Sequence, residues 1–211
     1  SYSFEFLPDL DLIQHKPTKL LLQNLEKMYL ENSNIGFLQD GHNLAKGYGE
    51  DFYKFIRKNL NLFSVKNILE IGCGACFLLE KLSIDGFKVE GIDPSPIAIR
   101  EGKKKNIHVI PKFFPSKSIS FKPDLIFHVD VLEHVSNPVD SLIKQKEFLS
   151  ENGIIIINVP DCSETIKAGD ISIAQHQHLN NFDINSLANV IEAAGLNVFN
   201  IEKAGFGGSL Y

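Results

Sequence analysis

The stretch ILEIGCGACFLLEKL, residues 68–82, joins an apolar run, two closely spaced glycines and a leucine-rich segment. The apolar run predicts a buried strand, and the segment after the glycines predicts a helix. Gly72 and Gly74 lie between them, where a residue without a Cβ lets the backbone turn sharply. We therefore predict a strand, a tight turn and a helix, which form the repeating unit of α/β sheets.

Alternating strands and helices continue from about residue 66 to the end of the chain. Asn137 followed by Pro138 is a favourable helix start, with a cap residue before a first-turn proline. The apolar strands indicate a parallel sheet that helices cover on both faces. We predict a doubly wound α/β fold with a mostly parallel, seven-stranded, Rossmann-like sheet. Its strands are expected at residues 67–72, 88–93, 107–111, 124–130, 153–160, 197–203 and 207–211.

The N-terminal part of the chain has a different pattern. Residues 17–32 carry apolar side chains at helical spacing, and residues 49–63 form another such segment. Residues 41–49, between them, are predicted to be a flexible connection. We predict an N-terminal helical cap at residues 1–60 and a cofactor-binding domain at residues 61–211.

Composition limits the class of protein and its partners. Of the 211 residues, 44% are hydrophobic and 22% are charged, which is ordinary for a soluble globular protein. The longest aliphatic run, Ile154–Ile157, is far shorter than the ~20 residues that span a bilayer. The acidic N-terminus lacks the features of a signal peptide, and a net charge of −5 argues against a nucleic-acid surface. We expect a cytoplasmic monomer or homodimer that acts on a small molecule, without nucleic-acid or membrane partners.

Cysteine and histidine spacing bears on metal binding. Cys73, Cys76 and Cys162 make no disulfide framework, which fits a reducing compartment. The pair Cys73 and Cys76 is a single CxxC without the second pair that a zinc site of this type needs. His176 and His178 are two residues apart, but no carboxylate cluster accompanies them in the sequence. The sequence therefore predicts no metal site.

The spacing of the glycines also bears on the kind of cofactor. The dinucleotide pattern G-x-G-x-x-G/A, counted from Gly72 and Gly74, places Phe77 at its third position. A phenyl group there obstructs close packing of the helix on the strand and approach of a pyrophosphate, which disfavours NAD. Glu70, just before the turn, suits a cofactor that carries an ammonium group better than one that carries a diphosphate.

Asp93 ends the second predicted strand, 21 residues after Gly72. An acid at this place accepts hydrogen bonds from both hydroxyls of a ribose. As an alternative, Asp93 ahead of Pro94 caps the following helix, and the two roles are compatible.

Two segments carry a resemblance to a known family. Glu70, Gly72 and Gly74 resemble the E-x-G-x-G-x-G pattern of class I S-adenosylmethionine-dependent methyltransferases, with Cys76 in place of the third glycine. FHVDVLEHVSNP, residues 127–138, resembles the segment after the fourth strand in many small-molecule methyltransferases, including the ubiquinone-biosynthesis O-methyltransferase type. The resemblance implies S-adenosyl-L-methionine as cofactor and S-adenosyl-L-homocysteine as product. It implies cofactor contacts from Glu70, Gly72, Cys73, Gly74, Asp93, Pro94, Asp130 and Val131.

Two further segments resemble the sugar C-methyltransferases of deoxysugar pathways. They are QHQHLNNFD at residues 175–183 and FGGSLY at residues 206–211. By this resemblance His178 is the general base, in the pH range where histidine titrates. The resemblance, together with position in the predicted fold, implies further catalytic residues at His134 and Tyr48 and acceptor contacts from His42, Glu133 and His176.

The same region departs from the sugar enzymes. Gln177 stands in place of a glutamate and Asn181 in place of a tyrosine, which weakens the stabilisation of an enolate that C-methylation needs. We therefore predict O-methylation of a small polar metabolite, namely a sugar, a sugar nucleotide or a phosphorylated precursor of a surface glycan. Sugar C-methylation is one alternative. A catalytically silent methyltransferase-like binding protein is the alternative from another class.

Overall fold

The computed structural model describes residues 3–31, 43–60, 63–170 and 177–211. Within these residues, no helix is long and apolar enough to cross a membrane. The strands are β1 (Phe4–Leu7), β2 (Leu12–His15), β3 (Asn67–Ile71), β4 (Lys88–Ile92), β5 (Val109–Ile110), β6 (Leu125–Val129), β7 (Ile154–Pro160), β8 (Asn180–Asn181) and β9 (Ser209–Leu210). The helices are α1 (Lys19–Leu30), α2 (Asn43–Leu60), α3 (Phe77–Ile84), α4 (Pro96–Lys104), α5 (Pro138–Phe148), α6 (Ser163–Ala168) and α7 (Ile184–Ala193), with a short 3-10 helix, η2, at Leu132–His134.

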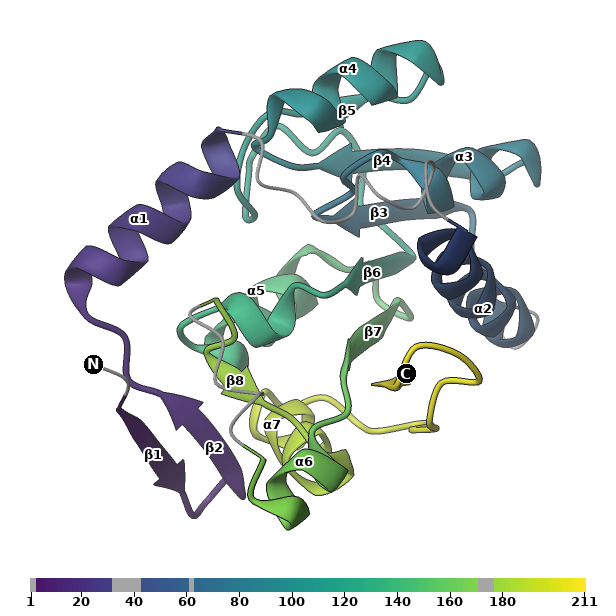
Figure 1. Ribbon diagram of the computed structural model, residues 1–211. Helices are drawn as coiled ribbons and strands as arrows, with labels where there is room; N and C mark the ends of the chain where they lie inside the picture. Colours follow the sequence, from purple (N-terminus) through teal and green to yellow (C-terminus); the bar gives the residue numbers. More distant parts are fainter. Residues whose placement is uncertain (1–2, 32–42, 61–62, 171–176) are drawn as a thin grey trace. The chain divides into compact units, whose positions relative to one another are not determined.

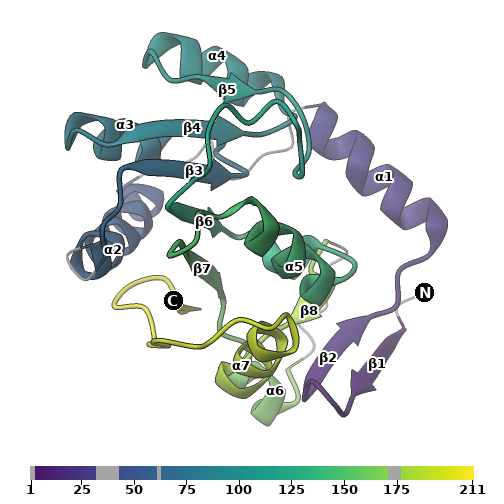
Figure 2. The ribbon, with the colours of Figure 1, turned by 180° about the vertical axis from the view of Figure 1, so that it is seen from behind.

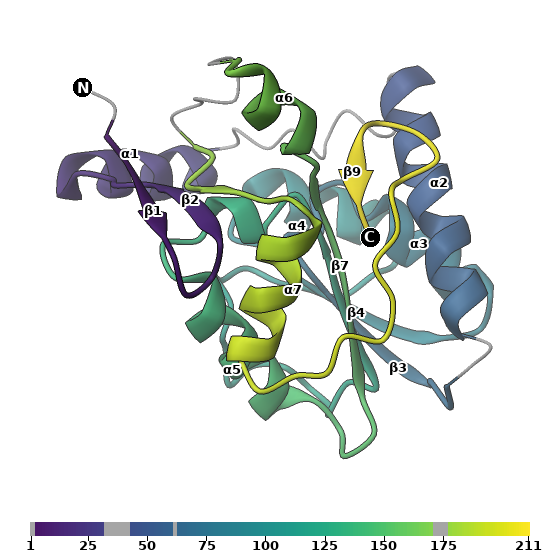
Figure 3. The ribbon, with the colours of Figure 1, turned by 90° about the horizontal axis from the view of Figure 1, so that it is seen from below.

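The main sheet is mostly parallel, with strands in the order β5-β4-β3-β6-β7-β9. β3 pairs in parallel with β4 and with β6, and β4 pairs in parallel with β5 (Figure 1). β9 lies antiparallel beside β7 (Figure 3). This arrangement, with helices between the parallel strands, confirms the predicted Rossmann-like α/β fold.

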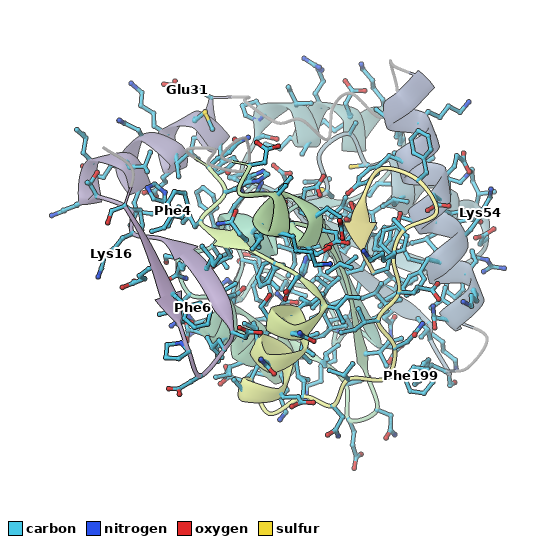
Figure 4. All side chains as sticks on the ribbon, turned by 60° about the horizontal axis from the view of Figure 1, so that its bottom comes forward. Phe4, Phe6, Lys16, Glu31, Lys54 and Phe199 are labelled. Carbon is cyan, nitrogen blue, oxygen red and sulfur yellow. The ribbon has the colours of Figure 1, made fainter. Side chains whose placement is uncertain are left out.

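Within the part of the chain that the structure describes, the main sheet has six strands, so the prediction of seven is wrong by one. Residues 197–203, all of them described, form no strand, and only Lys203 makes an isolated bridge, with Leu210. Phe199, at the centre of this segment, is 71% exposed (Figure 4). The segment therefore lacks the buried apolar face that stabilises a strand in a sheet.

The chain divides into two compact units by its internal contacts. The first unit comprises Ser1–Leu25, Val129–Lys146 and Ile157–Tyr211. The second unit comprises Glu26–His128 and Glu147–Ile156. A domain boundary at residue 60 stays a prediction.

The core of the second unit lies on β3 and β6. Ile68 and Leu69 of β3 and Ile126 of β6 are fully buried. Phe52 of α2 packs against Phe127 of β6, with ring centroids 6.3 Å apart, and α2 also contacts α3 (Figure 2). The continuous apolar runs in the sequence are explained by strands that are buried on both faces.

Helix α2 begins at Asn43, so the predicted flexible connection at residues 41–49 is wrong from residue 43 onward. Phe52 and Ile56 are fully buried and four residues apart, which places them on one face of this helix. The helix extends back through Gly47 and Gly49 from this buried face. A glycine inside a helix costs about 1 kcal/mol relative to alanine, which burial of such a face offsets.

The N-terminal segment is not wholly helical, which corrects the expectation for residues 4–15. β1 and β2 form an antiparallel hairpin in which Phe4 lies opposite His15, and β8 extends it through Asn181. Phe4 and Phe6, both labelled in Figure 4, stand on either side of Glu5 in the sequence of β1, a period-two pattern that suits a strand. The strands are only four residues long, which is too short for a reliable pattern in the sequence.

His128 on β6 is fully buried, and neither ring nitrogen has a hydrogen-bond partner among the described residues. Burial lowers the pKa of His128 from 6.5 to about 4. Because the unfolded chain binds this proton more readily, His128 stabilises the fold above about pH 6.5 and loses that contribution as the pH falls toward 4.

We expect His128 to contribute a fall in the free energy of unfolding between about pH 7 and pH 5, opposed by the raised pKa values of Glu70 and Glu133, and His128→Leu to remove that contribution. Part of the fall should remain in the variant, because burial also lowers the pKa of His134 to about 4. Urea unfolding of both proteins at the two pH values measures the difference. An equal fall in the wild type and in His128→Leu would contradict the assignment.

Candidate active site

The turn after β3 contains three residues in the left-handed region of the backbone. Gly72, Gly74 and Cys76 have φ angles of 71°, 47° and 58°. The N–H of Gly72 donates to the carbonyl of Ile92 (2.9 Å), and the N–H of Cys76 donates to the carbonyl of Cys73 (2.7 Å). Positive φ is the conformation that glycine adopts without strain. The structure thus confirms the predicted strand, turn and helix and explains why the glycines alternate.

Cys76 occupies the third of these positions, at the N-cap of α3. Its side chain is fully buried, with Sγ 3.9 Å from Sγ of Cys73 and 3.8 Å from the carbonyl oxygen of Gly74. A left-handed conformation costs a residue with a Cβ about 1–2 kcal/mol. The small thiol is therefore accommodated inside the protein, and the turn keeps the backbone that a third glycine would give.

Asp93 directly follows β4, and its side chain is hydrogen-bonded to the turn after β3. Its side chain is 3% exposed; Oδ2 accepts the N–H of Gly74 (2.9 Å) and Oδ1 accepts the N–H of Ser95 (2.8 Å). An ionised carboxylate has about four lone-pair sites, so one such group can accept several hydrogen bonds at once.

The N-cap of α4 is Ser95, whose Oγ accepts the N–H of Ala98 (3.3 Å) ahead of the proline at the first turn. The alternative reading of Asp93 as the helix cap is therefore wrong. Pro94, between the two residues, is half-buried. Sequence reasoning missed Ser95, although a serine directly before proline is a recognisable start signal.

Glu70 lies at the end of β3 and is 4% exposed. Its Oε2 atom has no hydrogen-bond partner among the described residues. Burial raises the pKa of Glu70 well above its usual value, the nearby Cys76 and Asp93 raise it further, and Lys105 opposes them. A buried carboxyl with an unsatisfied oxygen fits a ligand that brings a positive charge or a hydrogen-bond donor.

In the first unit, residues just beyond the carboxyl end of β6 form a second group. Asp130 has a φ of 52°, and its N–H donates to the carbonyl of Asn158 (3.1 Å). Val131 follows, and Glu133 lies in η2 with 1% of its surface exposed. Neither carboxylate oxygen of Glu133 has a hydrogen-bond partner among the described residues. Burial raises the pKa of Glu133 well above its usual value, and Asp130 adds to the shift.

Two histidines lie beside Glu133. Nδ1 of His134 is 2.7 Å from the carbonyl oxygen of Gln177, and its Nε2 is 3.7 Å from Oε1 of Glu133. The rings of His134 and His178 meet edge to face, with centroids 5.0 Å apart. Burial lowers the pKa of His134 to about 4 and lowers the pKa of His178 as well. We call Glu133, His134 and His178 the histidine cluster.

Hydrogen bonds from β8 and the residue before it hold the histidine cluster in place. The N–H of Leu179 donates to the carbonyl of Glu133 (2.7 Å). The side-chain amide of Asn180 donates to the carbonyls of Leu132 (3.1 Å) and Val135 (2.7 Å). Gln14 of β2 in turn donates to Oδ1 of Asn180 (2.7 Å). Sequence reasoning did not find these supports, because each joins residues more than 40 positions apart.

The structure therefore brings the predicted residues together in two groups. Glu70, Gly72, Cys73 and Gly74 meet Asp93 in the second unit, and Glu133, His134 and His178 meet in the first. Tyr48 lies half-buried on α2 of the second unit. His42 and His176 lie outside the described residues.

A family model described as a methyltransferase domain matches residues 42–201. The chain belongs to the methyltransferase-domain family. Membership confirms the resemblance to S-adenosylmethionine-dependent methyltransferases that Glu70, Gly72 and Gly74 predicted. S-adenosyl-L-methionine, the cofactor expected from the sequence, is the methyl donor that this family uses.

Individual relatives agree with the family. The mitochondrial ubiquinone biosynthesis O-methyltransferase of Schizosaccharomyces pombe is 29% identical over 135 residues, 60% of this chain and 49% of that protein. A tRNA U34 carboxymethyltransferase of Shewanella denitrificans is 24% identical over 146 residues, 64% of this chain and 44% of that protein. The chain thus spans about half the length of these methyltransferase-domain relatives.

Among solved structures, N-methyltransferase NodS from Bradyrhizobium japonicum shares the fold. Its complex with S-adenosyl-L-homocysteine matches with a TM-score of 0.61 at 19% identity, covering 90% of this chain and 95% of that one. At 19% identity this structural similarity shows the fold alone.

Proposed function

We propose that this methyltransferase domain binds S-adenosyl-L-methionine at the turn after β3. The observation that carries the proposal is the bond from Gly74 to the buried Asp93, beside a buried Glu70 whose Oε2 atom has no hydrogen-bond partner among the described residues. In this proposal Asp93 accepts the ribose hydroxyls, and Glu70 receives the ammonium group of the methionine part. The left-handed turn at Gly72 and Gly74 leaves the backbone free of side chains where the ligand approaches. Cys73 and Pro94 of the same unit complete these proposed contacts, and the cofactor contacts of Asp130 and Val131 stay predictions from the sequence.

We propose that the reaction is O-methylation. When bound, the cofactor supplies an electrophilic methyl group on a sulfonium. The name of the ubiquinone biosynthesis relative supports a hydroxyl acceptor, and the histidine cluster supports its activation. His178 takes the proton of the hydroxyl, with its ring positioned against His134. Tyr48 is proposed as a further catalytic residue, and His42, Glu133 and His176 as acceptor contacts.

The proposed acceptor is a small molecule that carries a hydroxyl group. The relatives lend no support to the sugar acceptor expected from the sequence, and we therefore leave the carbon skeleton open. C-methylation is disfavoured because Gln177 and Asn181 replace the acid and the phenol of the sugar enzymes. Residues 1–60 are proposed to select the acceptor. The net charge of −5 disfavours a polyanion such as tRNA as acceptor.

Transfer of a labelled methyl group from S-adenosyl-L-methionine tests the proposal. The acceptor panel comprises phenols and catechols, sugars and sugar nucleotides, and tRNA. We expect label on an oxygen of a small molecule, located by mass spectrometry of the product. Label on tRNA, or on carbon, would contradict the proposed reaction. Cofactor binding without transfer to any acceptor would favour the catalytically silent alternative.

A further inference from the structure

We propose that Glu133, His134 and His178 bind a divalent transition-metal cation, Zn²⁺ or one of similar ligand preference. Each residue offers one ligand atom, and these atoms all lie within 4.8 Å of one another. Two imidazoles and one carboxylate are a ligand set that such cations favour. The sequence predicted no metal because no carboxylate stands near His178 in the chain, but the fold brings Glu133 to it across about 45 residues.

The state of Glu133 supports this proposal independently. The side chain is 1% exposed, and both carboxylate oxygens lack hydrogen-bond partners among the described residues. A buried carboxyl left in this way is costly, because it has given up water without gaining another partner. A cation coordinated by Glu133 would supply the missing interaction, and His178 beside it is half-buried rather than fully enclosed.

The orientation of His134 also fits a ligand. A carbonyl oxygen only accepts hydrogen bonds, so the 2.7 Å contact with Gln177 places the ring proton on Nδ1. The neutral ring then presents the lone pair of Nε2, which lies 3.7 Å from Oε1 of Glu133. Histidines that bind metals commonly donate their other ring N–H to a backbone carbonyl in this way.

The cation would activate the acceptor, so the inference rests on the proposed function and deepens it. Three protein ligands leave coordination positions open for the acceptor oxygen. The cation lowers the pKa of the bound hydroxyl, the O–H bond breaks and its proton passes to water. The oxygen then forms a bond to the methyl carbon, and the electron pair of the broken S–C bond stays on sulfur. In the metal-bound form His178 is therefore a ligand rather than the base.

Metal binding is measured on the whole chain after chelation and dialysis, with Zn²⁺ titrated calorimetrically and Co²⁺ followed by its visible absorption. We expect one ion per chain, and at least hundredfold weaker binding in His178→Ala and in Glu133→Gln. Glu133→Gln keeps the size of the side chain and removes a buried carboxyl, so after chelation it should unfold at no lower temperature than the metal-stripped wild type. His108→Ala, an exposed histidine of the second unit, is the matched control and should bind as the wild type does.

The outcomes separate this inference from the proposed function. No Zn²⁺ or Co²⁺ binding by the wild type, or equal binding by His178→Ala and Glu133→Gln, would overturn the metal site. Methyl transfer at the full rate by protein freed of metal would also overturn the role of the cation. That result would not contradict the proposed O-methylation. Stoichiometric binding that both variants lose supports the site even where no acceptor has yet been methylated.

Discussion

Replacing Asp93 with alanine is expected to weaken binding of S-adenosyl-L-homocysteine about a hundredfold or more, roughly 2.7 kcal/mol. The substitution removes the proposed acceptor for two ribose hydroxyls, and a hydrogen bond to a charged group contributes about 1.5–3 kcal/mol. It also leaves the N–H groups of Gly74 and Ser95 without the carboxylate that they share. Calorimetric titration of the wild type and the variant measures the change.

A matched control for Asp93 is Asp85→Ala. Asp85 is an exposed aspartate at the C-cap of α3, in the same unit, and it pairs with Tyr53 and Arg57. We expect this variant to bind S-adenosyl-L-homocysteine as the wild type does. Equal affinity in the wild type and in a folded Asp93→Ala protein would remove Asp93 from the cofactor site.

Replacing His178 with alanine is expected to lower the turnover of a hydroxyl acceptor by about 10²–10⁴-fold, the range in which a positioned acid or base contributes. The affinity for S-adenosyl-L-homocysteine should stay the same, because the proposed ribose and ammonium contacts belong to the turn after β3. Steady-state kinetics with a labelled methyl donor, together with calorimetry, measure both quantities on one preparation.

His108→Ala serves as the control here too, because His108 is an exposed histidine whose partner is Glu90 of β4. Turnover in this variant is expected to match that of the wild type. Unchanged turnover in His178→Ala would show that the histidine cluster does not act on the acceptor, whether through a proton or through a cation.

The turn after β3 and the buried parallel strands could be predicted from the sequence, because each depends on neighbouring residues alone. The turn after β3 was predictable because three left-handed residues in five demand glycine or a small substitute, as Gly72, Gly74 and Cys76 show. The parallel strands were predictable because burial on both faces gives unbroken aliphatic runs such as Ile154–Ile157. The strand prediction for residues 197–203 was wrong because the sequence around Phe199 has the pattern of a strand, whereas the phenyl ring is exposed in the structure.

The parts that sequence reasoning missed depend on contacts between distant residues. β2 pairs with β8 through Ile13 and Asn181, which are far apart in the chain, and both strands are short. The same pairing brings Asn180 to the carbonyls around Glu133, which sets the histidine cluster. No local sequence pattern predicts that a carboxylate and a histidine distant in the chain will lie side by side in the fold. The metal proposal therefore depends on the structure.

The proposed cofactor site is tested by calorimetric titration of S-adenosyl-L-homocysteine, and separately of NAD⁺, into the wild-type chain. We predict one site with an affinity on the order of micromolar for S-adenosyl-L-homocysteine and no heat from NAD⁺. No binding of S-adenosyl-L-homocysteine to a chain that unfolds cooperatively, or tighter binding of NAD⁺, would contradict the assignment of the turn after β3 as the methyl donor's site.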